Sequence, residues 1–372
     1  MTLLQQMESL KKTPLYDRHA ALGGKIVNFG GFALPVYYSG ILAEHEWTRK
    51  SCSVFDVSHL GEVRVQGDRA FEFLQKRLTG DLQKLEDNKI LYNVLCSEEG
   101  KALDDVLVCQ ATHTDFYVIV NASNIEKDFE EFRRYVPEGV KLTNPSAEIA
   151  CLAVQGPKSE EILEKLFGFK LKDLRYYYFK EEKFKNEFVW VSRSGYTGED
   201  GFEIFSSNVF STALWDRLVN DGKVQGVLPA GLGARNTLRL EAGNVLYGND
   251  MDETTTPLEA GLGWAVSFTK GDFLGRSALL KQKEEGLKRK LVGFKVLEKP
   301  IAREHYPIYS QGKKIGRVTS GSFGPTVGYN IGLGYVEKGF EVPGTPIEIE
   351  IHGRAVPAEI VRRPFITLKH KR

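Results

Sequence analysis

Alternation of hydrophobic and polar residues is clearest between residues 91 and 109, LYNVLCSEEGKALDDVLVC. The alternation predicts two strands, Leu91–Cys96 and Ala102–Cys109, with the polar residues 97–100 as a tight loop between them. We expect this hairpin to be the element around which the rest of the chain is organised.

Two acidic residues, Asp104 and Asp105, lie inside the apolar second strand. Successive side chains of a strand point to opposite faces, so at least one carboxyl group enters a packed environment, where ionisation costs free energy unless a partner compensates it. A four-residue loop pairs Cys96 with Lys101 and places Tyr92 opposite Asp105, within reach of its side chain. The alternative is that both aspartates end the strand at a solvated edge, and spacing alone leaves the two interpretations open.

The remaining apolar pattern predicts a mixture of helices and strands. Helices are expected at 41–50, 68–78, 123–135, 159–166, 208–219 and 229–243, and strands at 62–66, 115–120, 149–154, 188–192 and 202–205. The charged run 281–290 marks a domain boundary. Beyond it, a small all-β domain is predicted by short strands at 291–298, 313–319, 331–336, 346–351 and 355–362.

Composition narrows the class of protein. A chain of 372 residues is too long for one core, which indicates two or three domains. Its 50 basic and 49 acidic residues leave a net charge of +1, so no global field favours nucleic acid. No apolar run approaches the ~20 residues that a membrane span needs. The N-terminus is too polar for a signal peptide, and the four cysteines form no CxxC pair. We therefore expect a cytoplasmic protein with reduced thiols and no metal site.

Two arginines form a first candidate binding group. Arg235 and Arg239 share one face of the predicted helix 229–243, where paired guanidinium groups suit a carboxylate ligand or a buried acid. Glu241 is the internal acid that competes with a ligand for one of them. Patterns such as GxxxxGK[ST], HExxH and GxSxG are absent from the sequence, and His59 is expected to be structural.

The segment GYTGEDGFE forms a second candidate group, because it brings Tyr196, Glu199, Asp200 and Glu203 together around three glycines. Acidic groups beside an aromatic ring suit a heterocycle that carries N–H donors. A solvated turn is the competing interpretation. It fits Glu199 and Asp200 better than Glu203, which lies in an apolar strand.

A series of motifs, running from residue 13 to about residue 365, resembles a known family. In chain order they are TPLYDRH, FDVSHL, LDDVLV, AVQGP, RSGYTGEDGFEI, GLGARNTLRLEAG, LYGNDMDE and PLEAGLGW, followed by VTSG and GLGYV. Together they resemble the aminomethyltransferase, or T-protein, of the glycine cleavage system. GYTGEDG and ARxTLRLEAG are the most specific of these motifs.

The resemblance implies an α+β fold with three domains in a cloverleaf around a central folate site, the last of them an all-β, barrel-like domain. The first, discontinuous domain is expected at residues 1–55 plus about 145–245. The second, which carries the hairpin, is expected at about 56–144 plus 246–280, and the third at about 285–372.

The resemblance also implies a reaction. The methylene carbon of an aminomethyl group on lipoylated H-protein is transferred to tetrahydrofolate, the co-substrate, giving 5,10-methylenetetrahydrofolate, ammonia and dihydrolipoyl H-protein without a metal. By position, the catalytic acid of the family falls on Asp105. The substrate-binding residues fall on Glu203 and Arg235, with Tyr196 and Tyr92 as further candidates for lining the pterin. The chain is expected to be a monomer whose partners are H-protein and tetrahydrofolate, not nucleic acid or a membrane.

Three positions depart from the family pattern. Leu60 stands where Met is usual, Gly324 where Ser is usual, and Asn236 replaces the usual Asp, which removes a charge beside Arg235. Three rival functions stay open. They are a folate-dependent demethylase or amine-oxidising module, a folate-binding protein that assists iron–sulfur cluster assembly, and a carboxylate-binding regulatory protein. The second rival carries a KGCYxGQE-like stretch that this sequence lacks.

Overall fold

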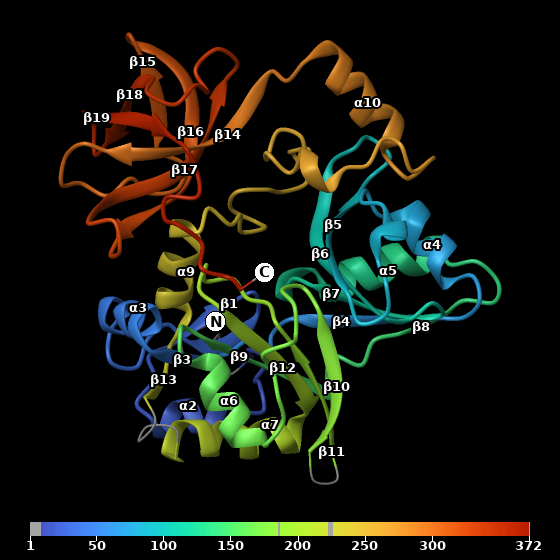
Figure 1. Ribbon diagram of the computed structural model, residues 1–372. Helices are drawn as coiled ribbons and strands as arrows, with labels where there is room; N and C mark the ends of the chain where they lie inside the picture. The colour runs from blue at the N-terminus through green and yellow to red at the C-terminus, as the bar shows by residue number, and fades with distance from the viewer. Residues whose placement is uncertain (1–8, 185–186, 222–225, 372) are drawn as a thin grey trace.

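Three large sheets, each with its own hydrophobic core, surround the centre of the molecule (Figure 1). The computed structural model describes residues 9–184, 187–221 and 226–371. The C-terminal segment leaves the barrel and runs to the centre, between the other two sheets (Figure 1). The predicted α+β cloverleaf with a C-terminal barrel is confirmed.

The first sheet combines an early strand with strands from the middle of the chain, in the order β10-β11-β12-β9-β3-β13. The strands are β3 (Cys52–Asp56), β9 (Ile149–Gln155), β10 (Phe179–Phe184), β11 (Glu187–Ser192), β12 (Gly201–Ser207) and β13 (Val227–Pro229). The same lobe holds α2 (Tyr16–Ala21), α3 (Ile41–Lys50), α6 (Ser159–Phe167), α7 (Asn208–Asp216), α9 (Leu232–Glu241) and the hairpin β1 (Ile26–Phe29) with β2 (Phe32–Pro35). Its core packs apolar faces of β9 and β12 against α7, where Trp215 is fully buried. Gly243 has φ +72° directly after α9, which is the conformation a helix stop requires.

The second sheet contains the predicted hairpin, in the order β5-β6-β7-β4-β8. Its elements are β4 (Gly61–Gln66), α4 (Ala70–Arg77), β5 (Ile90–Cys96), β6 (Ala102–Thr112), β7 (Asp115–Val120), α5 (Ile125–Tyr135) and β8 (Lys141–Thr143). Because β6 lies between β5 and β7, the interpretation that Asp104 and Asp105 end a strand at a solvated edge is wrong. Asp104 instead points into the core with Val106 and Val108, all three buried.

The register of the hairpin differs from the prediction. Tyr92 lies opposite Leu107, and Asp105 lies opposite Val94, because Cys96 pairs with Ala102 instead of Lys101 and the register shifts by one further residue beside it. A shift by two residues keeps every side chain on its face, since the period of a strand is two. Tyr92 and Asp105 therefore remain diagonal neighbours on one face, within reach of each other.

The third sheet is a closed barrel, in the order β14-β17-β16-β15-β18-β19. Its strands are β14 (Arg289–Val296), β15 (Pro307–Ser310), β16 (Lys313–Gly324), β17 (Tyr329–Glu337), β18 (Pro346–Ile351) and β19 (Arg354–Val361). Every predicted late strand is confirmed, whereas the four-residue β15 was missed. The charged run is not one linker, because its first half belongs to α10 (Arg276–Glu285) and its end begins β14. The predicted domain boundaries stay a proposal, which the membership of the three sheets supports.

Within the described ranges, no helix is both long and apolar enough to cross a membrane. The four cysteines are buried free thiols.

Candidate active site

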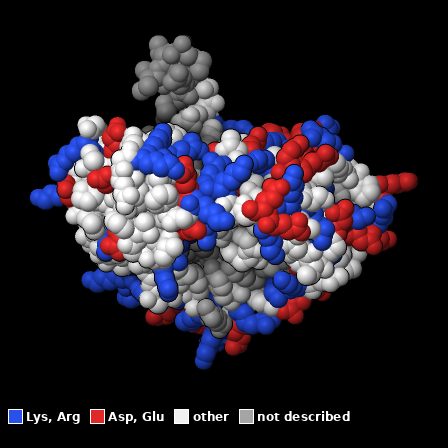
Figure 2. Space-filling view, turned by 90° about the horizontal axis from the view of Figure 1, so that it is seen from above, with Lys and Arg blue, Asp and Glu red and all other residues white. Residues whose placement is uncertain are grey.

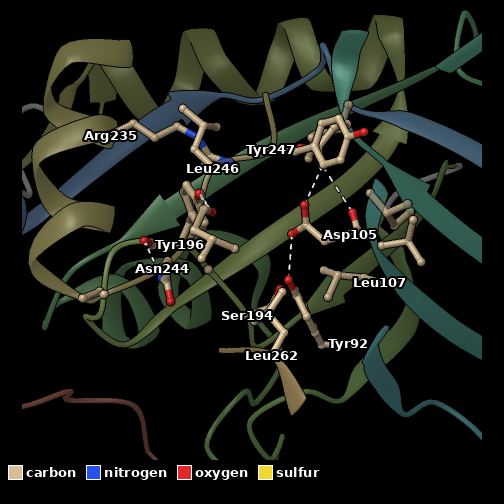
Figure 3. Close-up of a pocket in the computed structure, with 18 of the residues that line it drawn as sticks. Tyr92, Asp105, Leu107, Ser194, Tyr196, Arg235, Asn244, Leu246, Tyr247 and Leu262 are labelled. Carbon is tan, nitrogen blue, oxygen red and sulfur yellow. Dashed lines mark hydrogen bonds between the residues drawn. The ribbon is translucent and has the colours of Figure 1, made fainter. Parts of the chain in front are cut away.

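A cavity of about 440 Å³ lies between the lobes of the first two sheets and the segment that follows the barrel. Asp105 of β6, Glu203 of β12 and Arg235 of α9 line it, and Arg363 reaches it from the segment after the barrel. Figure 3 shows Arg235 and Tyr196 entering from one side, and Asp105 and Tyr92 from the other. The volume lies in the range of small-molecule sites.

Asp105 presents its carboxyl group to this cavity. The Tyr92 hydroxyl donates a hydrogen bond of 3.0 Å to its Oδ2, and the Asn121 side chain donates one of 3.1 Å to its Oδ1. Burial, and next the charge of Asp104, raise the pKa of Asp105 to about 7. A carboxyl group with such a pKa can both hold and release a proton near neutral pH.

Asp104 occupies the opposite face of β6 and is fully buried. Its oxygens accept from the Asn121 backbone N–H at 3.0 Å, and from the side-chain amides of Asn121 and Asn124 at 2.8 Å each. These hydrogen bonds give Asp104 a structural role between β6 and the segment after β7, while the neighbouring Asp105 faces the cavity.

Arg235 has no side-chain hydrogen bond or ion pair with any described residue. Its guanidinium group stacks over the ring of Tyr196, 4.6 Å from the centroid, and burial lowers its pKa. The competing partner, Glu241, is bound instead by Arg49 at 3.0 Å and by His45 at 3.2 Å. The cavity therefore contains a guanidinium group that forms no ion pair with a described residue, although the charge of Glu203 across the cavity acts on it.

Arg239, one helical turn along α9, is fully bound. It forms an ion pair of 2.6 Å with Asp250 and donates at 2.9 Å to the Ser320 hydroxyl. Asn236 accepts from the Arg239 Nε at 2.9 Å. The unusual residue Asn236 thus serves Arg239 rather than Arg235.

The glycine-rich segment places Glu203 and Tyr196 at the cavity. Glu203 is 7% exposed and accepts a short hydrogen bond from the Ser194 hydroxyl, whereas the Tyr196 hydroxyl donates to the Val245 carbonyl. The solvated-turn interpretation of the other two acids is wrong. Both are buried in ion pairs: Glu199 with Arg49 and Lys369, and Asp200 with Arg193.

Asn121, Trp264 and His59 also line the cavity, and the sequence analysis assigned none of them to a binding or catalytic site. Asn121 immediately follows β7, beside the predicted aspartates, and that position is the one available signal for it. Trp264 is 68% exposed and lies 5.1 Å from the ring of Tyr92, centroid to centroid. His59, expected to be structural, is buried at the cavity, where burial and Arg235 lower its pKa to about 3 and keep it neutral.

No cluster of three or more His, Cys, Asp and Glu side chains suited to a metal ion occurs among the residues described. A guanidinium group without an ion-pair partner among the described residues, a carboxyl group with a raised pKa and several aromatic rings around one cavity are typical of an enzyme site that binds a polar, ring-containing ligand.

Comparison with known proteins agrees with this class. Residues 15–270 match the GCVT N-terminal domain, and residues 289–366 match the glycine cleavage T-protein C-terminal barrel domain. The chain belongs to the glycine cleavage T-protein family.

Relatives of full length support this membership. The aminomethyltransferases of Thermoanaerobacter pseudethanolicus and Halothermothrix orenii are each 47% identical to the chain, over 98% and 96% of it and 100% of their own lengths. The crystal structure of the glycine cleavage system aminomethyltransferase T from Bartonella henselae superposes with a TM-score of 0.91. It is 34% identical and covers 97% of this chain and 99% of that one.

Proposed function

We propose that the chain, an aminomethyltransferase of the glycine cleavage system, transfers the methylene carbon from lipoylated H-protein to tetrahydrofolate inside the central cavity. One observation carries the proposal: Asp105, with Tyr92 at 3.0 Å, and Arg235, which has no ion pair among the described residues, line the same cavity. Such a site orients a bound heterocycle between a proton-exchanging group and a fixed cation.

The reaction requires two proton movements. The donor is a sulfur–methylene–amine unit, and its carbon–sulfur and carbon–nitrogen bonds break while two new carbon–nitrogen bonds form to N5 and N10 of the folate. The two folate amine protons end on the sulfur and on the departing ammonia. Asp105 orients and activates the folate amine and, once ionised, stabilises the iminium-like positive charge on the methylene carbon.

Binding of the folate depends on the opposite side of the cavity. Glu203 accepts N–H groups of the pterin, and Arg235 binds an anionic group of the ligand, since charge-assisted hydrogen bonds give orientation as well as affinity. Tyr196 and Tyr92 supply ring faces and edges beside the pterin.

Docking of H-protein is a transient encounter in this proposal. Lys and Arg side chains gather near the middle of one face of the molecule, next to Asp and Glu (Figure 2). Local charge of this kind accelerates encounter more than it strengthens a complex, so turnover is expected to fall as salt rises from low to physiological concentration. We also propose that the chain works as a monomer, which sedimentation at working concentration checks.

The decisive experiment measures ammonia release from aminomethylated H-protein, with and without tetrahydrofolate. The expected result is rapid release that requires tetrahydrofolate and forms 5,10-methylenetetrahydrofolate in equal amount. Tetrahydrofolate binding without any turnover would favour a folate-binding protein. Turnover of methylated small amines in place of the H-protein substrate would favour the demethylase.

A further inference from the structure

An acidic residue lies on the buried face of helix α5. Asp128 lies between Ile125 and Phe132 in the sequence, at helical spacing, and all three are buried. The spacing is that of an apolar stripe, so an apolar residue is expected at this position. Its carboxyl group needs a compensating interaction or a bound proton.

Neither oxygen of Asp128 receives a hydrogen bond from an N–H or hydroxyl group in the described part of the chain. The neighbouring cation, Lys127, is directed to the Leu103 carbonyl at 2.7 Å and to Glu253 at 3.0 Å. An ionised carboxylate in this place would be buried without a partner, which is strongly disfavoured. Burial, and next the charge of Asp104, raise the pKa of Asp128 to about 11.

Asp104 is the group that a protonated Asp128 can reach, because the two carboxyl groups form a side-chain hydrogen bond when one of them carries a proton. Asp104 already accepts three amide hydrogen bonds. The side-chain amide of Asn121 lies 2.8 Å from Asp104 Oδ1 and 3.1 Å from Asp105 Oδ1. Hydrogen bonds through Asn121 therefore connect Asp104 to Asp105 at the cavity wall, and a proton on Asp128 would extend this chain to α5.

We propose that Asp128 is a positioning residue that stays protonated, donates its hydrogen to Asp104 and, through Asn121, holds Asp105 in place as an ionisable group. The inference rests on the proposed function of Asp105. The other titratable groups that face these three carboxyl groups are Lys127 of α5, Tyr92 of β5 and the loop residues Tyr177, Tyr196 and Tyr247.

The first test compares Asp128→Asn with Asp128→Ala in the folate-free protein. Asparagine keeps the shape, the neutrality and the donor, whereas alanine removes the donor. Loss of a donor to the ionised Asp104 makes the Asp104–Asp105 pair bind a proton more tightly, so its upper pKa rises. Carbon-13 NMR of the aspartate carboxyl groups, assigned with Asp105→Asn, is expected to show an unchanged titration in the asparagine variant. In the alanine variant it is expected to move up by about one pH unit.

Thermal unfolding provides a test that does not depend on activity. An aspartic acid that is neutral when folded and ionised when unfolded binds a proton on folding, so its contribution to stability is lost as pH rises above ~4. An asparagine at position 128 does not ionise, so the Asp128→Asn variant does not lose stability in this way as pH rises. The difference in Tm between the variant and the parent is therefore expected to grow from pH 6 to pH 9. A gain that does not change with pH, or a Tm below the parent throughout, overturns the proposal. The matched control for the NMR and turnover measurements is Glu62→Gln, which changes another buried carboxyl group outside this hydrogen-bond chain.

Turnover separates positioning from mere stability. Asp128→Asn is expected to keep kcat within ~3-fold of the parent, while Asp128→Ala loses ~10-fold or more in kcat with little change in KM for tetrahydrofolate. Equal losses in both variants, or no loss in either, would contradict the proposal. If Asp105→Asn turns over normally, the proposed role of Asp105 fails. The NMR and unfolding measurements then still decide whether Asp128 holds the proton.

Discussion

Strand β6 and helix α9 each carry a pair of like charges, and in each pair only one member is left for the cavity. On β6, Asp104 is bound by amide groups and Asp105 lines the cavity. On α9, Arg239 is bound by Asp250, and Arg235 lines the cavity with no ion pair among the described residues. One bound charge beside one charge that faces the cavity therefore occurs both on a strand, where side chains repeat every two residues, and on a helix, where they repeat about every 3.6.

The two pairs differ in how the inner charge is compensated. Arg239 forms an ion pair with the opposite charge of Asp250, although its own charge still acts on Arg235 and Tyr196. Asp104 meets neutral amides and the carboxyl group of Asp128, so its negative charge still acts on its neighbour and contributes to the raised pKa of Asp105. An ion pair produces a firm anchor, whereas a hydrogen-bonded charge tunes the proton affinity of the group beside it.

Replacement of Arg239 by Met should give the largest effect on stability. The change leaves Asp250 buried at 0% exposure without its cation, and the free energy of unfolding is expected to fall by about 3–5 kcal/mol. Arg235→Met is the matched control, since it breaks no ion pair. Chemical denaturation measures both, and equal losses would mean that the two arginines are not divided in the way described.

Replacement of Asp105 by Asn should give the largest effect on turnover. The change keeps the volume and removes the charge, so kcat is expected to fall by ~10² or more while tetrahydrofolate binding changes little. If Asp105 only ties the hairpin to Tyr92, the variant will unfold more easily and keep normal turnover per folded molecule. That outcome would show that the charge of Asp105 at the cavity has no role in turnover.

Arg235→Ala should act on binding and not on folding. Tetrahydrofolate affinity is expected to weaken by ~2 kcal/mol or more, because a charge-assisted hydrogen bond to the ligand is lost. Arg235→Lys should restore it only in part, since an ammonium cannot reproduce the planar guanidinium. Calorimetry on the folded variants measures the affinity, and an unchanged value would exclude Arg235 as a ligand contact.

Asp104→Asn tests the electrostatic half of the comparison and has the smallest effect. Removal of a like charge lowers the pKa of Asp105, so the acidic limb of kcat/KM, at about pH 7 in the parent, is expected to shift to lower pH by about one unit. A pH profile of kcat/KM measures the shift. A shift to higher pH would show that the charge of Asp104 does not raise the pKa of Asp105, and the loss of all turnover at every pH would indicate that Asp104 is itself the reacting group.

Much of this arrangement follows from local patterns. The polar and apolar alternation around residues 91–109 predicted the hairpin, and its period of two predicted that Asp104 and Asp105 face opposite ways. The motif GLGARNTLRLEAG predicted a helix with Arg235 and Arg239 one turn apart. Glu203 was singled out correctly as the buried acid of an apolar strand. The assignment of roles to Asp105, Glu203 and Arg235 came from the family resemblance and stays a prediction.

The errors arose where a residue depends on distant partners. Glu199 was assigned to a solvated turn, because nothing in its sequence neighbourhood indicates its partners Arg49 and Lys369, which lie more than a hundred residues away. Asp200 is different, since its partner Arg193 lies in the same motif, seven residues earlier, and the pair was overlooked. His59 was set aside, although it lines the cavity, because its neighbours Phe29 and Arg235 come from other elements. The register of the hairpin was missed because neither the pairing of Cys96 with Ala102 nor the bulge of one residue beside it has a clear mark in the sequence.

The sequence by itself determined which residues alternate, which turn together on a helix and which family the motifs resemble, since all three depend on neighbours along the chain. Only the tertiary structure decided which member of each charged pair faces the cavity. Arg239 is bound by Asp250 of a loop and by Ser320 of the barrel. Asp104 is surrounded by Asn121 after β7, by Asn124 before α5 and by Asp128 of α5. A buried charge takes the partner that packing brings within ~3 Å, and that choice depends on long-range contacts rather than on local sequence.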